Sequence, residues 1–397
     1  MLICPSFFDG RLDGIGRVSG AFHQAMTRMN GCAPFVVSSN DAPGACPPDS
    51  GRCFGRHYRR LLWEALFLAD ERAKAGESRR APASGQSARP IVCTHLGLSP
   101  AARLAAFSSG RPYVVFLHGI EAWRPLPWRS RWAVAGADRL LFNSDYTRNN
   151  FLRFNTWAAG LPATVVPLGM ALPESRSASG GEAERLPVSP DGSNRPASAR
   201  GERFRILIVG RMTRAEHCEG FRDATDLYKG FKPLIMAVGL LARAVPGVRL
   251  RIAGDGDARA DLEAWLAGRS EREFVDFLGR VSDERLEQLY READVFALPS
   301  EEEGFGLVFV EAMAHGVPCV GVRAGATPEV VTDGETGLIA EPRDVADLAD
   351  KLLVLARNPA IRTRLGAAAR QTYADKFTAA AFEDRIIAAL RAVPSRR

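Results

Sequence analysis

The chain has 397 residues, 46% apolar and 25% charged, which is typical of globular domains that fold in water. This length exceeds what one ordinary hydrophobic core supports, so two domains are expected. No run of residues reaches the ~18–20 apolar positions of a membrane span, and the first residues show no secretory signal pattern. The seven cysteines are scattered without a C-x-x-C pair, which argues against a disulfide framework or a zinc site and indicates a reducing cytoplasm.

The net charge of +6 is unevenly distributed. Residues 1–170 carry 20 Lys and Arg against 11 Asp and Glu, a net +9, whereas residues 201–397 carry 28 against 31, a net −3. The first half is therefore expected to favour an anionic partner or surface, and its arginines suit phosphate groups. An arginine-rich composition without functional meaning is an equal alternative. No helix-turn-helix, zinc-finger or RNP-like motif indicates a nucleic acid partner.

Short β-branched segments alternate with amphipathic ones along the chain. Strands are expected at 1–4, 34–38, 91–94, 113–117, 139–143, 164–167, 205–209, 248–253, 274–278, 294–298, 318–322 and 336–340. Helical patterns such as 231–244, 283–292 and 344–357 lie between them. This alternation predicts parallel sheets covered on both faces. Twelve strands exceed one comfortable sheet, so the expected fold class is α/β with two doubly wound domains.

Composition also predicts the boundaries of these domains. Residues 172–203 are rich in Ser, Ala, Gly and Pro and lack a hydrophobic period, as expected of a linker or mobile loop. Similar stretches at 41–55 and 76–90 are expected to be surface insertions. The expected organisation is an N-terminal domain, a linker, a C-terminal domain and a last helix that packs back on the first domain, with bounds 1–170, 171–203, 204–376 and 377–397.

The stretch EEEGFGLVFVEAMAHGVPCV, residues 301–320, is unusual. It predicts a Gly-Phe-Gly turn, then a helix over 307–315 that Gly316 ends, with helix N–H groups facing an anion. Glu311 lies on an apolar helix face, where an unpaired carboxylate is costly, so its oxygens are expected to accept hydrogen bonds, with ribose hydroxyls as one candidate. Glu303, in the turn, is placed to accept from ligand hydroxyls. Glu301 and Glu302 are expected to be surface partners of the helix dipole.

Two cations follow or precede predicted elements of the second half. Arg211 follows the strand 205–209, and Lys229 precedes the helix 231–244. Two cations near a diphosphate would neutralise a leaving group as its charge develops. Two solvated surface cations are the alternative.

The first half offers weaker signals. DGIGRVSG, residues 13–20, predicts a glycine-rich turn that lets helix 15–29 approach a ligand. His118 follows a strand and is either a packing residue or a ligand contact. AWRPLPWRSRW, residues 122–132, interleaves three Trp with three Arg, which suits a lipid headgroup surface, a polar acceptor or a loop against the core. His217 and Cys218 lack further ligands, so no metal is expected.

Together these features resemble the retaining glycosyltransferases of family four, which have the GT-B fold of two Rossmann-like domains facing across a cleft. EEGFGLVFVEAMAHGVPCVG is similar to the E-x7-E signature of that family. VGRM…YKGF, IAGDG, FLGRVSDERLEQLYREADVFALPS and GATPEVVTDGETGLI follow the order of the family's segments.

The resemblance implies an enzyme that moves a hexosyl group, with retention, from a nucleotide diphosphate sugar to a glycan or lipid-linked acceptor in surface polysaccharide or glycolipid synthesis. GDP-mannose is the donor hypothesis, and neither a metal nor another cofactor is expected. The expected location is the cytoplasm, including the inner face of an anionic membrane.

The resemblance also implies roles for individual residues. Arg211 and Lys229 would clamp the diphosphate, Glu303 would bind a sugar hydroxyl, and His118 would contact the sugar. Glu311 would bind the ribose hydroxyls and Val281 would line the base. The remaining expected donor contacts are the glycine turn of the first domain, a serine near the active site and the helix-start N–H groups, namely Gly14, Gly16, Ser144, Phe305, Gly306 and Leu307.

Some features depart from the family pattern. Arg211 and Lys229 lie eighteen residues apart, further than usual, so residues 213–227 form an insertion that could touch donor or acceptor. Residues 324–326 read Ala-Gly-Ala where paired glycines are usual. Two other functions remain open, a glycoside hydrolase that uses Glu303 and Glu311 and a non-catalytic nucleotide-sugar-binding protein. An NAD-dependent oxidoreductase is disfavoured, because no G-x-G-x-x-G directly follows a strand.

Overall fold

The structure is a computed structural model that describes residues 1–7, 14–42, 45, 47, 50–65, 89–172, 203–213 and 229–394. The predicted linker, the predicted insertion at 76–90 and the loop 213–227 lie almost entirely outside these residues. The chain divides into two compact units. Unit 1 comprises Met1–Leu168 and Ala379–Arg397, and unit 2 comprises Gly169–Thr378.

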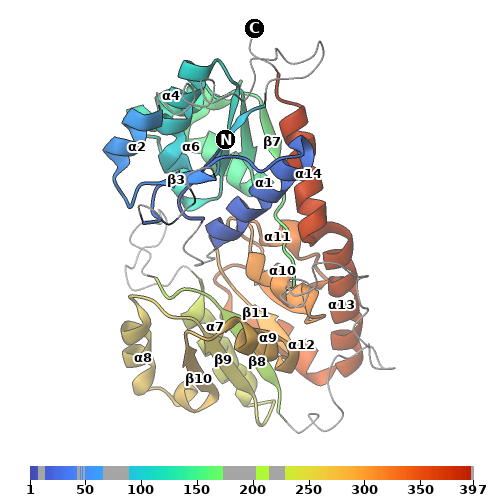
Figure 1. Ribbon diagram of the computed structural model, residues 1–397. Coiled ribbons are helices and arrows are strands. Elements are labelled where there is room, and N and C mark those ends of the chain that lie inside the picture. Colours follow the sequence, from blue (N-terminus) through green and yellow to red (C-terminus); the bar gives the residue numbers. More distant parts are fainter. Residues whose placement is uncertain are drawn as a thin grey trace. The chain divides into compact units, whose positions relative to one another are not determined.

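Unit 1 contains a seven-stranded sheet in which every pair of neighbours is parallel (Figure 1). Its strands are β1 Leu2–Cys4, β2 Val36–Ser38, β3 Gly51–Cys53, β4 Ile91–Cys93, β5 Tyr113–Leu117, β6 Arg139–Phe142 and β7 Ala163–Val165. The order β3-β2-β1-β4-β5-β6-β7 reverses direction between β1 and β4. All six strands predicted in this half are present.

The strand β3 corrects one prediction, because it lies within 41–55, which was expected to be a surface insertion. It pairs with β2 alone, at the edge of the sheet. An edge strand of the sequence Gly-Arg-Cys carries no alternating apolar pattern, so periodicity could not reveal it.

The helices of unit 1 include the last helix of the chain. They are α1 Gly14–Asn30, α2 Tyr58–Ala65, α4 Ser99–Ser109, α5 Trp128–Ala135, α6 Asp145–Phe154 and α14 Ala379–Arg391. The helix α14 packs beside α1 (Figure 1). The buried Phe382 ring lies edge-on to Phe22 at 6.3 Å, and Arg28 forms ion pairs with Glu383 at 2.8 Å and Asp384 at 3.0 Å. The end of the chain therefore completes the core of unit 1.

Unit 2 contains a six-stranded sheet, also parallel throughout. Its strands are β8 Arg205–Val209, β9 Arg249–Ala253, β10 Val275–Gly279, β11 Val295–Ala297, β12 Cys319–Val322 and β13 Gly337–Ala340. The order β10-β9-β8-β11-β12-β13 reverses direction between β8 and β11. All six strands predicted in this half are present, so the predicted class, two doubly wound α/β domains, is confirmed.

Helices alternate with these strands and continue beyond β13, and those predicted at 231–244, 283–292, 307–315 and 344–357 are present. The α-helices described in unit 2 are α7 Phe231–Ala242, α8 Arg259–Ala267, α9 Asp283–Glu292, α10 Leu307–Ala314, α11 Thr327–Val330, α12 Val345–Arg357 and α13 Pro359–Thr372. Side chains cap two of them in the expected manner. Ser282 Oγ accepts from the Arg285 N–H before α9, and Asp344 accepts from the Asp347 N–H before α12. Gly316, with φ +69°, follows α10 as predicted.

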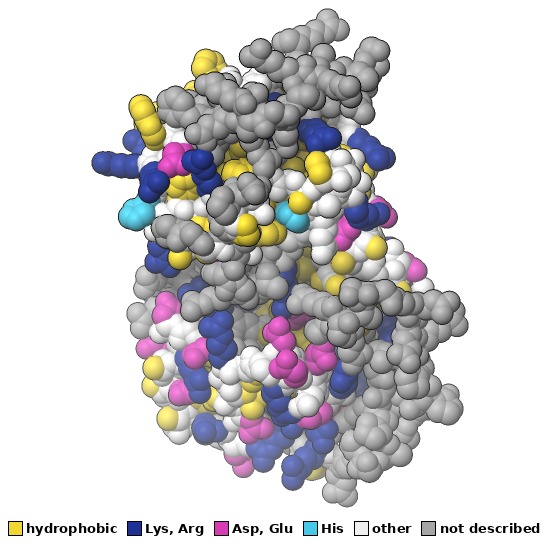
Figure 2. Space-filling model, viewed as in Figure 1, with side chains coloured by type: hydrophobic (Ala, Val, Ile, Leu, Met, Phe, Trp, Pro, Cys, Tyr) yellow, Lys and Arg dark blue, Asp and Glu magenta, His cyan; other side chains and the backbone are white. Residues whose placement is uncertain are grey.

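The surface of unit 2 and the described helices bear on whether this part of the chain could span a membrane. On the face shown in Figure 2, the acidic and basic side chains of unit 2 are interspersed. No helix within the described ranges has both the length and the apolar character that crossing a bilayer requires.

We expect Phe382→Ala to lower the free energy of unfolding of unit 1 by about 3–5 kcal/mol, because it removes a fully buried ring. Phe107→Ala is the matched control, since Phe107 is 84% exposed, and it should change stability by less than about 0.5 kcal/mol. Urea unfolding of the full-length variants measures both. Equal effects would contradict the assignment of α14 to the core of unit 1.

Candidate active site

The candidate residues of unit 2 cluster where its sheet reverses direction. The neighbouring strands β8 and β11 are parallel, so the segments that follow them leave from the same edge. Arg211 follows β8 after Gly210, and the turn 299–306 follows β11. Doubly wound sheets bind ligands at such a switch point, beyond the carboxyl ends of the strands.

The predicted Gly-Phe-Gly turn is present. Gly306 has φ +89° and directly precedes α10. A Cβ there would lie 2.7 Å from the Phe309 ring and 3.3 Å from the Glu303 side chain, so only glycine fits. Phe305 is buried, with its ring edge-on to Phe377 at 5.9 Å. The first N–H groups of α10, which begins at Leu307, have no carbonyl partner within the helix.

Lys229 and Glu303 form an ion pair. Their side chains are only 15% and 13% exposed, so each charge needs the other. Gly230, with φ +71°, makes this approach possible, because a Cβ there would lie 2.2 Å from the Pro299 carbonyl oxygen. Two predicted site residues, 74 positions apart, are thus in direct contact.

Arg211 lies beside this pair. The Lys229 side chain passes Gly210, with its Cγ 3.8 Å from where a Gly210 Cβ would be. Arg211 is exposed, and no ion pair joins it to another residue of the described chain. Its guanidinium is therefore available at the edge of the sheet.

The loops after β8 and β9 contact each other backbone to backbone. A Cβ on Gly254 would lie 2.0 Å from the Gly210 carbonyl oxygen, and one on Gly256 would lie 2.0 Å from the Met212 carbonyl oxygen. The glycines of the IAGDG segment, residues 252–256, are therefore required for the loop that carries Arg211 to pack this closely.

Glu311 is buried, at 7% exposed, and is hydrogen-bonded. Its Oε2 accepts from the Tyr290 hydroxyl of α9 at 2.8 Å. The Tyr290 ring stacks on His315, with centroids 5.2 Å apart, and His315 Nδ1 lies 2.8 Å from the Glu311 carbonyl oxygen. Burial lowers the pKa of His315 below its usual 6.5. Sequence reasoning missed Tyr290, because its hydroxyl partner lies on another helix.

Three further residues, Val281, Glu301 and Glu302, lie near this edge of the sheet. Val281 is half-buried between β10 and α9. Glu301 corrects a prediction: it lies six residues before α10 and pairs with Arg343, so it is not a partner of the α10 dipole. Glu302 is half-buried.

In unit 1, Gly14 and Gly16 lie in the first turn of α1. Ser19 of this helix shares a buried hydrogen bond with Thr94, 2.9 Å between the hydroxyl oxygens. His118 follows β5, and its Nε2 lies 2.6 Å from the Thr94 carbonyl oxygen. Thr94, which the sequence did not single out, therefore links α1 to His118.

The backbone around His118 is firmly held. The Glu121 carboxylate accepts from the His118 N–H at 2.7 Å and from the Gly119 N–H at 3.2 Å. Ser144, from the next strand end, is fully buried, and its Oγ accepts from the Thr147 N–H at the start of α6. Ser144 thus acts as a helix cap in the structure, and its contact with the donor remains a prediction.

Within the described ranges, no three His, Cys, Asp or Glu side chains are grouped to hold a metal ion. Burial raises the pKa of Cys93, at the end of β4, to about 12, so it stays a thiol at neutral pH. His217 and Cys218 lie outside the described residues.

We expect Tyr290→Phe to lower the free energy of unfolding by about 1–3 kcal/mol, because it removes a donor from a buried carboxyl group. Tyr58→Phe is a control, since the Tyr58 hydroxyl bonds the Gly97 carbonyl at an exposed position, and it should cost less than about 0.5 kcal/mol. Thermal unfolding compares the two. Equal shifts would show that the Tyr290–Glu311 bond does not stabilise the site.

Comparison with known proteins agrees with this geometry. Residues 221–372 match the family described as glycosyl transferases group 1. The chain is 31% identical over 336 residues to a glycogen synthase of Mycobacterium tuberculosis, covering 80% of this chain and 72% of that protein. It is 31% identical over 287 residues to the GDP-mannose-dependent alpha-(1-6)-phosphatidylinositol monomannoside mannosyltransferase of the same organism, covering 69% and 67%.

The fold is shared with solved structures. The crystal structure of Anabaena Alr3699/HepE in complex with UDP superposes with a TM-score of 0.69 over 98% of each chain, at 19% identity. The predicted GT-B fold is thereby confirmed. The two Mycobacterium tuberculosis relatives are 31% identical to the chain over 72% and 67% of their own length. The chain therefore belongs to the glycosyl transferases of group 1.

Proposed function

We propose that this enzyme is a retaining hexosyltransferase that takes its sugar from a nucleotide diphosphate donor and uses no metal. The acceptor class we propose is a glycan or a lipid-linked sugar. The observation that carries the proposal is the Lys229–Glu303 pair beside the start of α10, at the switch point of the unit 2 sheet. A cation, a hydroxyl acceptor and a helix N-terminus meet there, which is the set of groups that a sugar diphosphate needs.

In this proposal the donor separates the pair. The diphosphate takes Lys229 and Arg211 as counter-charges, and Glu303 turns to accept a hydrogen bond from a sugar hydroxyl. The N–H groups of Phe305, Gly306 and Leu307 bind the phosphate and the sugar. Because charge grows on the diphosphate as the glycosidic bond breaks, cations held there stabilise the transition state more than the ground state.

The other proposed donor contacts come from the family resemblance. Glu311, oriented by Tyr290, binds the ribose hydroxyls, and Val281 lines the base. Gly14, Gly16, Ser144 and His118 of unit 1 are the proposed contacts with phosphate and sugar.

Retention without a protein nucleophile is our proposal for the stereochemistry. In the proposed complex the Glu303 carboxylate accepts from a sugar hydroxyl, Glu311 is buried against Tyr290, and Cys93 is a thiol, so none of these groups is poised to attack a sugar carbon. Departure of the diphosphate and attack of the acceptor on the same face of the sugar then give retention.

The identity of the donor is the finer part of the proposal. The mannosyltransferase of Mycobacterium tuberculosis is named as GDP-mannose-dependent, which supports mannose from GDP-mannose. The Anabaena structure contains UDP, which makes a UDP-sugar the competing donor. Hydrolysis of GDP-mannose, UDP-glucose and ADP-glucose by the purified protein, without acceptor, decides between them, and hydrolysis of a UDP-sugar alone would reject GDP-mannose.

We expect Glu311→Ala and Glu303→Ala to act on different steps. Glu311→Ala should weaken binding of the nucleotide diphosphate about tenfold, because a buried hydrogen-bonding partner of the ribose is lost. Glu303→Ala should mainly lower turnover, by about 10²-fold, the scale seen when a transition-state contact is removed. Calorimetry gives the affinity and nucleotide release gives the turnover.

Glu335→Ala, at an exposed position, is the control and should behave as wild type. Wild-type turnover in the Glu303 variant would contradict the proposed role of Glu303. Donor binding without any turnover would favour a non-catalytic nucleotide-sugar-binding protein. Release of free sugar from an oligosaccharide without a nucleotide would favour a glycoside hydrolase.

We also propose that part of the protein associates with anionic membranes through α5 of unit 1. Trp128 and Trp132 are 72% and 42% exposed there, among the arginines of residues 122–132. Exposed Trp with Arg suits an anionic headgroup region.

The membrane prediction is tested by flotation with vesicles. Wild-type protein should float with vesicles that contain phosphatidylglycerol and much less with pure phosphatidylcholine. Replacing Arg124, Arg129 and Arg131 by Gln should reduce the fraction of protein that floats with the phosphatidylglycerol vesicles, because each basic residue contributes about 1 kcal/mol near such a surface. Unchanged partition of the triple variant would reject this surface.

A further inference from the structure

The turn between β13 and α12 contains a strained residue. Arg343 has φ +63°, and among the described residues Arg56, with φ +70°, is the other non-glycine residue with positive φ. This conformation costs an L-residue with a Cβ about 1–2 kcal/mol. Strain of this kind persists only where the surroundings impose it, and it is concentrated at functional sites.

The guanidinium of Arg343 donates hydrogen bonds to both carboxylate oxygens of Glu301. Its Nε lies 3.1 and 3.0 Å from the two carboxylate oxygens, and its Nη2 lies 3.0 Å from Oε2. The Arg343 side chain is 67% exposed and the Glu301 side chain is 23% exposed. A forked contact of this kind is the geometry in which arginine recognises a carboxylate most specifically, and it joins the strained turn to the segment that carries Glu303.

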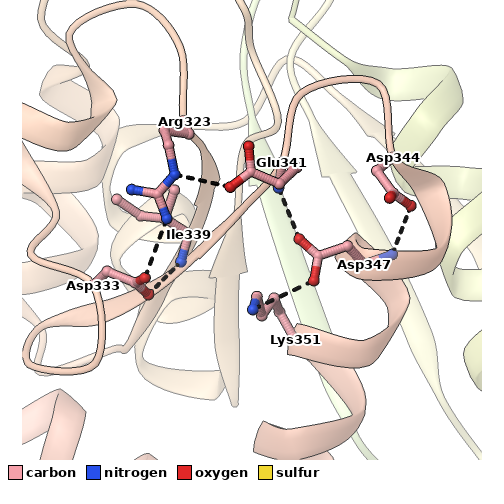
Figure 3. A network of polar contacts seen from close by, with 7 residues as sticks. All are labelled: Arg323, Asp333, Ile339, Glu341, Asp344, Asp347 and Lys351. Carbon is pink, nitrogen blue, oxygen red and sulfur yellow. Dashed lines mark hydrogen bonds and ion pairs between the residues drawn. The ribbon is translucent and has the colours of Figure 1, made fainter.

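A polar network fixes the turn that holds Arg343 (Figure 3). Arg323 bonds Glu341 at 2.9 Å, and the Glu341 N–H donates to Asp347 at 2.8 Å. Asp344 caps α12 through the Asp347 N–H at 2.9 Å. Lys351 holds Asp347 at 3.3 Å, and Asp333 accepts from Arg323 and from the Ile339 N–H. The residues on both sides of Arg343 are thereby fixed.

Glu301 belongs to the turn 299–306, which carries Glu303. Other contacts also hold this turn. The Ala326 N–H donates to the Glu303 carbonyl oxygen at 2.8 Å, with Gly325, at φ +60°, close against the Glu303 backbone. Lys229 holds the Glu303 carboxylate. The attachment to Lys229 is lost if a donor takes Lys229 away, whereas the Arg343–Glu301 pair involves neither Lys229 nor Glu303 and can persist.

We propose that Arg343 is a positioning residue for sugar transfer: through Glu301 it keeps the turn 299–306 in place while Glu303 exchanges Lys229 for a sugar hydroxyl. This inference rests on the proposed function of the Lys229–Glu303 pair. Glu311 lies within α10, beyond the turn, and the proposed diphosphate cations Arg211 and Lys229 lie on other segments. Loss of Arg343 should therefore affect the sugar-dependent step most and the affinity for the nucleotide little.

The test is Arg343→Gly, because glycine adopts the same backbone without strain. The melting temperature should be equal to or higher than that of wild type. Affinity for the nucleotide diphosphate of the preferred donor should stay within about twofold, whereas kcat should fall about 10–100-fold, the scale of a misplaced catalytic group. Arg56→Gly is the matched control, since it relieves the same strain in unit 1, and its kcat should match wild type.

Two further measurements separate positioning from a general structural role. Glu301→Gln should reproduce the loss of kcat, and the double variant with Arg343→Gly should lose no more than either single variant, because both changes break one contact. Hydrogen exchange of peptides covering 299–308 should rise in Arg343→Gly and stay unchanged in Arg56→Gly.

The inference fails if Arg343→Gly turns over like an active wild type, if its nucleotide affinity falls in step with kcat, or if exchange of 299–308 is unchanged. The proposed function would still stand in each case. If wild type neither binds nor hydrolyses GDP-mannose, UDP-glucose or ADP-glucose, the proposed function and this inference are both rejected.

Discussion

The site in unit 2 depends on an ion pair, Lys229–Glu303, at the carboxyl-end edge of a parallel sheet. Lys229 and Glu303 are both mostly withdrawn from water, and neither charge could stay there alone without a large desolvation penalty. A ligand that displaces one of them must bring a replacement for both. It must supply negative charge for the lysine and a hydroxyl donor for the carboxylate, and a sugar joined to a diphosphate does so in one molecule. The selectivity that we propose for this class of compound would therefore start from the electrostatics of the ligand-free site.

Glycines determine how closely the surrounding loops approach. Gly230 packs on the Pro299 carbonyl, Gly254 on Gly210, and Gly306 on the Phe309 ring, each at a distance that excludes a Cβ. Three loops from separate strands can therefore converge on a small volume. The segments that resemble the glycosyltransferase signature thus have a steric meaning independent of the resemblance: they bring Arg211, Lys229 and Glu303 to one edge of the sheet.

The sequence predicted features that are local or periodic. The buried strands have continuous apolar runs, and the turn before α10 has its glycines, so both could be located. Interactions between side chains of different elements have no such signal. Tyr290 reaches Glu311 from another helix, Thr94 links α1 to His118, and Arg343 reaches Glu301 across 42 positions. The strand β3 was missed because its residues, Gly-Arg-Cys, show no apolar pattern. Roles toward a donor depend on a bound molecule, so they follow from the family resemblance and from electrostatics.

The helix α14 has a consequence for how the protein is made. Unit 2 is one uninterrupted stretch of chain, whereas unit 1 needs both the first 168 residues and the final segment from Ala379. On the ribosome, the N-terminal sheet emerges first but waits for α14 until all of unit 2 has been made, with Phe22 lacking its Phe382 partner. The later-made half is then the first that can reach its complete native structure, an inversion of the usual N-terminal-first order. Nascent chains stalled before residue 379 should thus be especially dependent on chaperones.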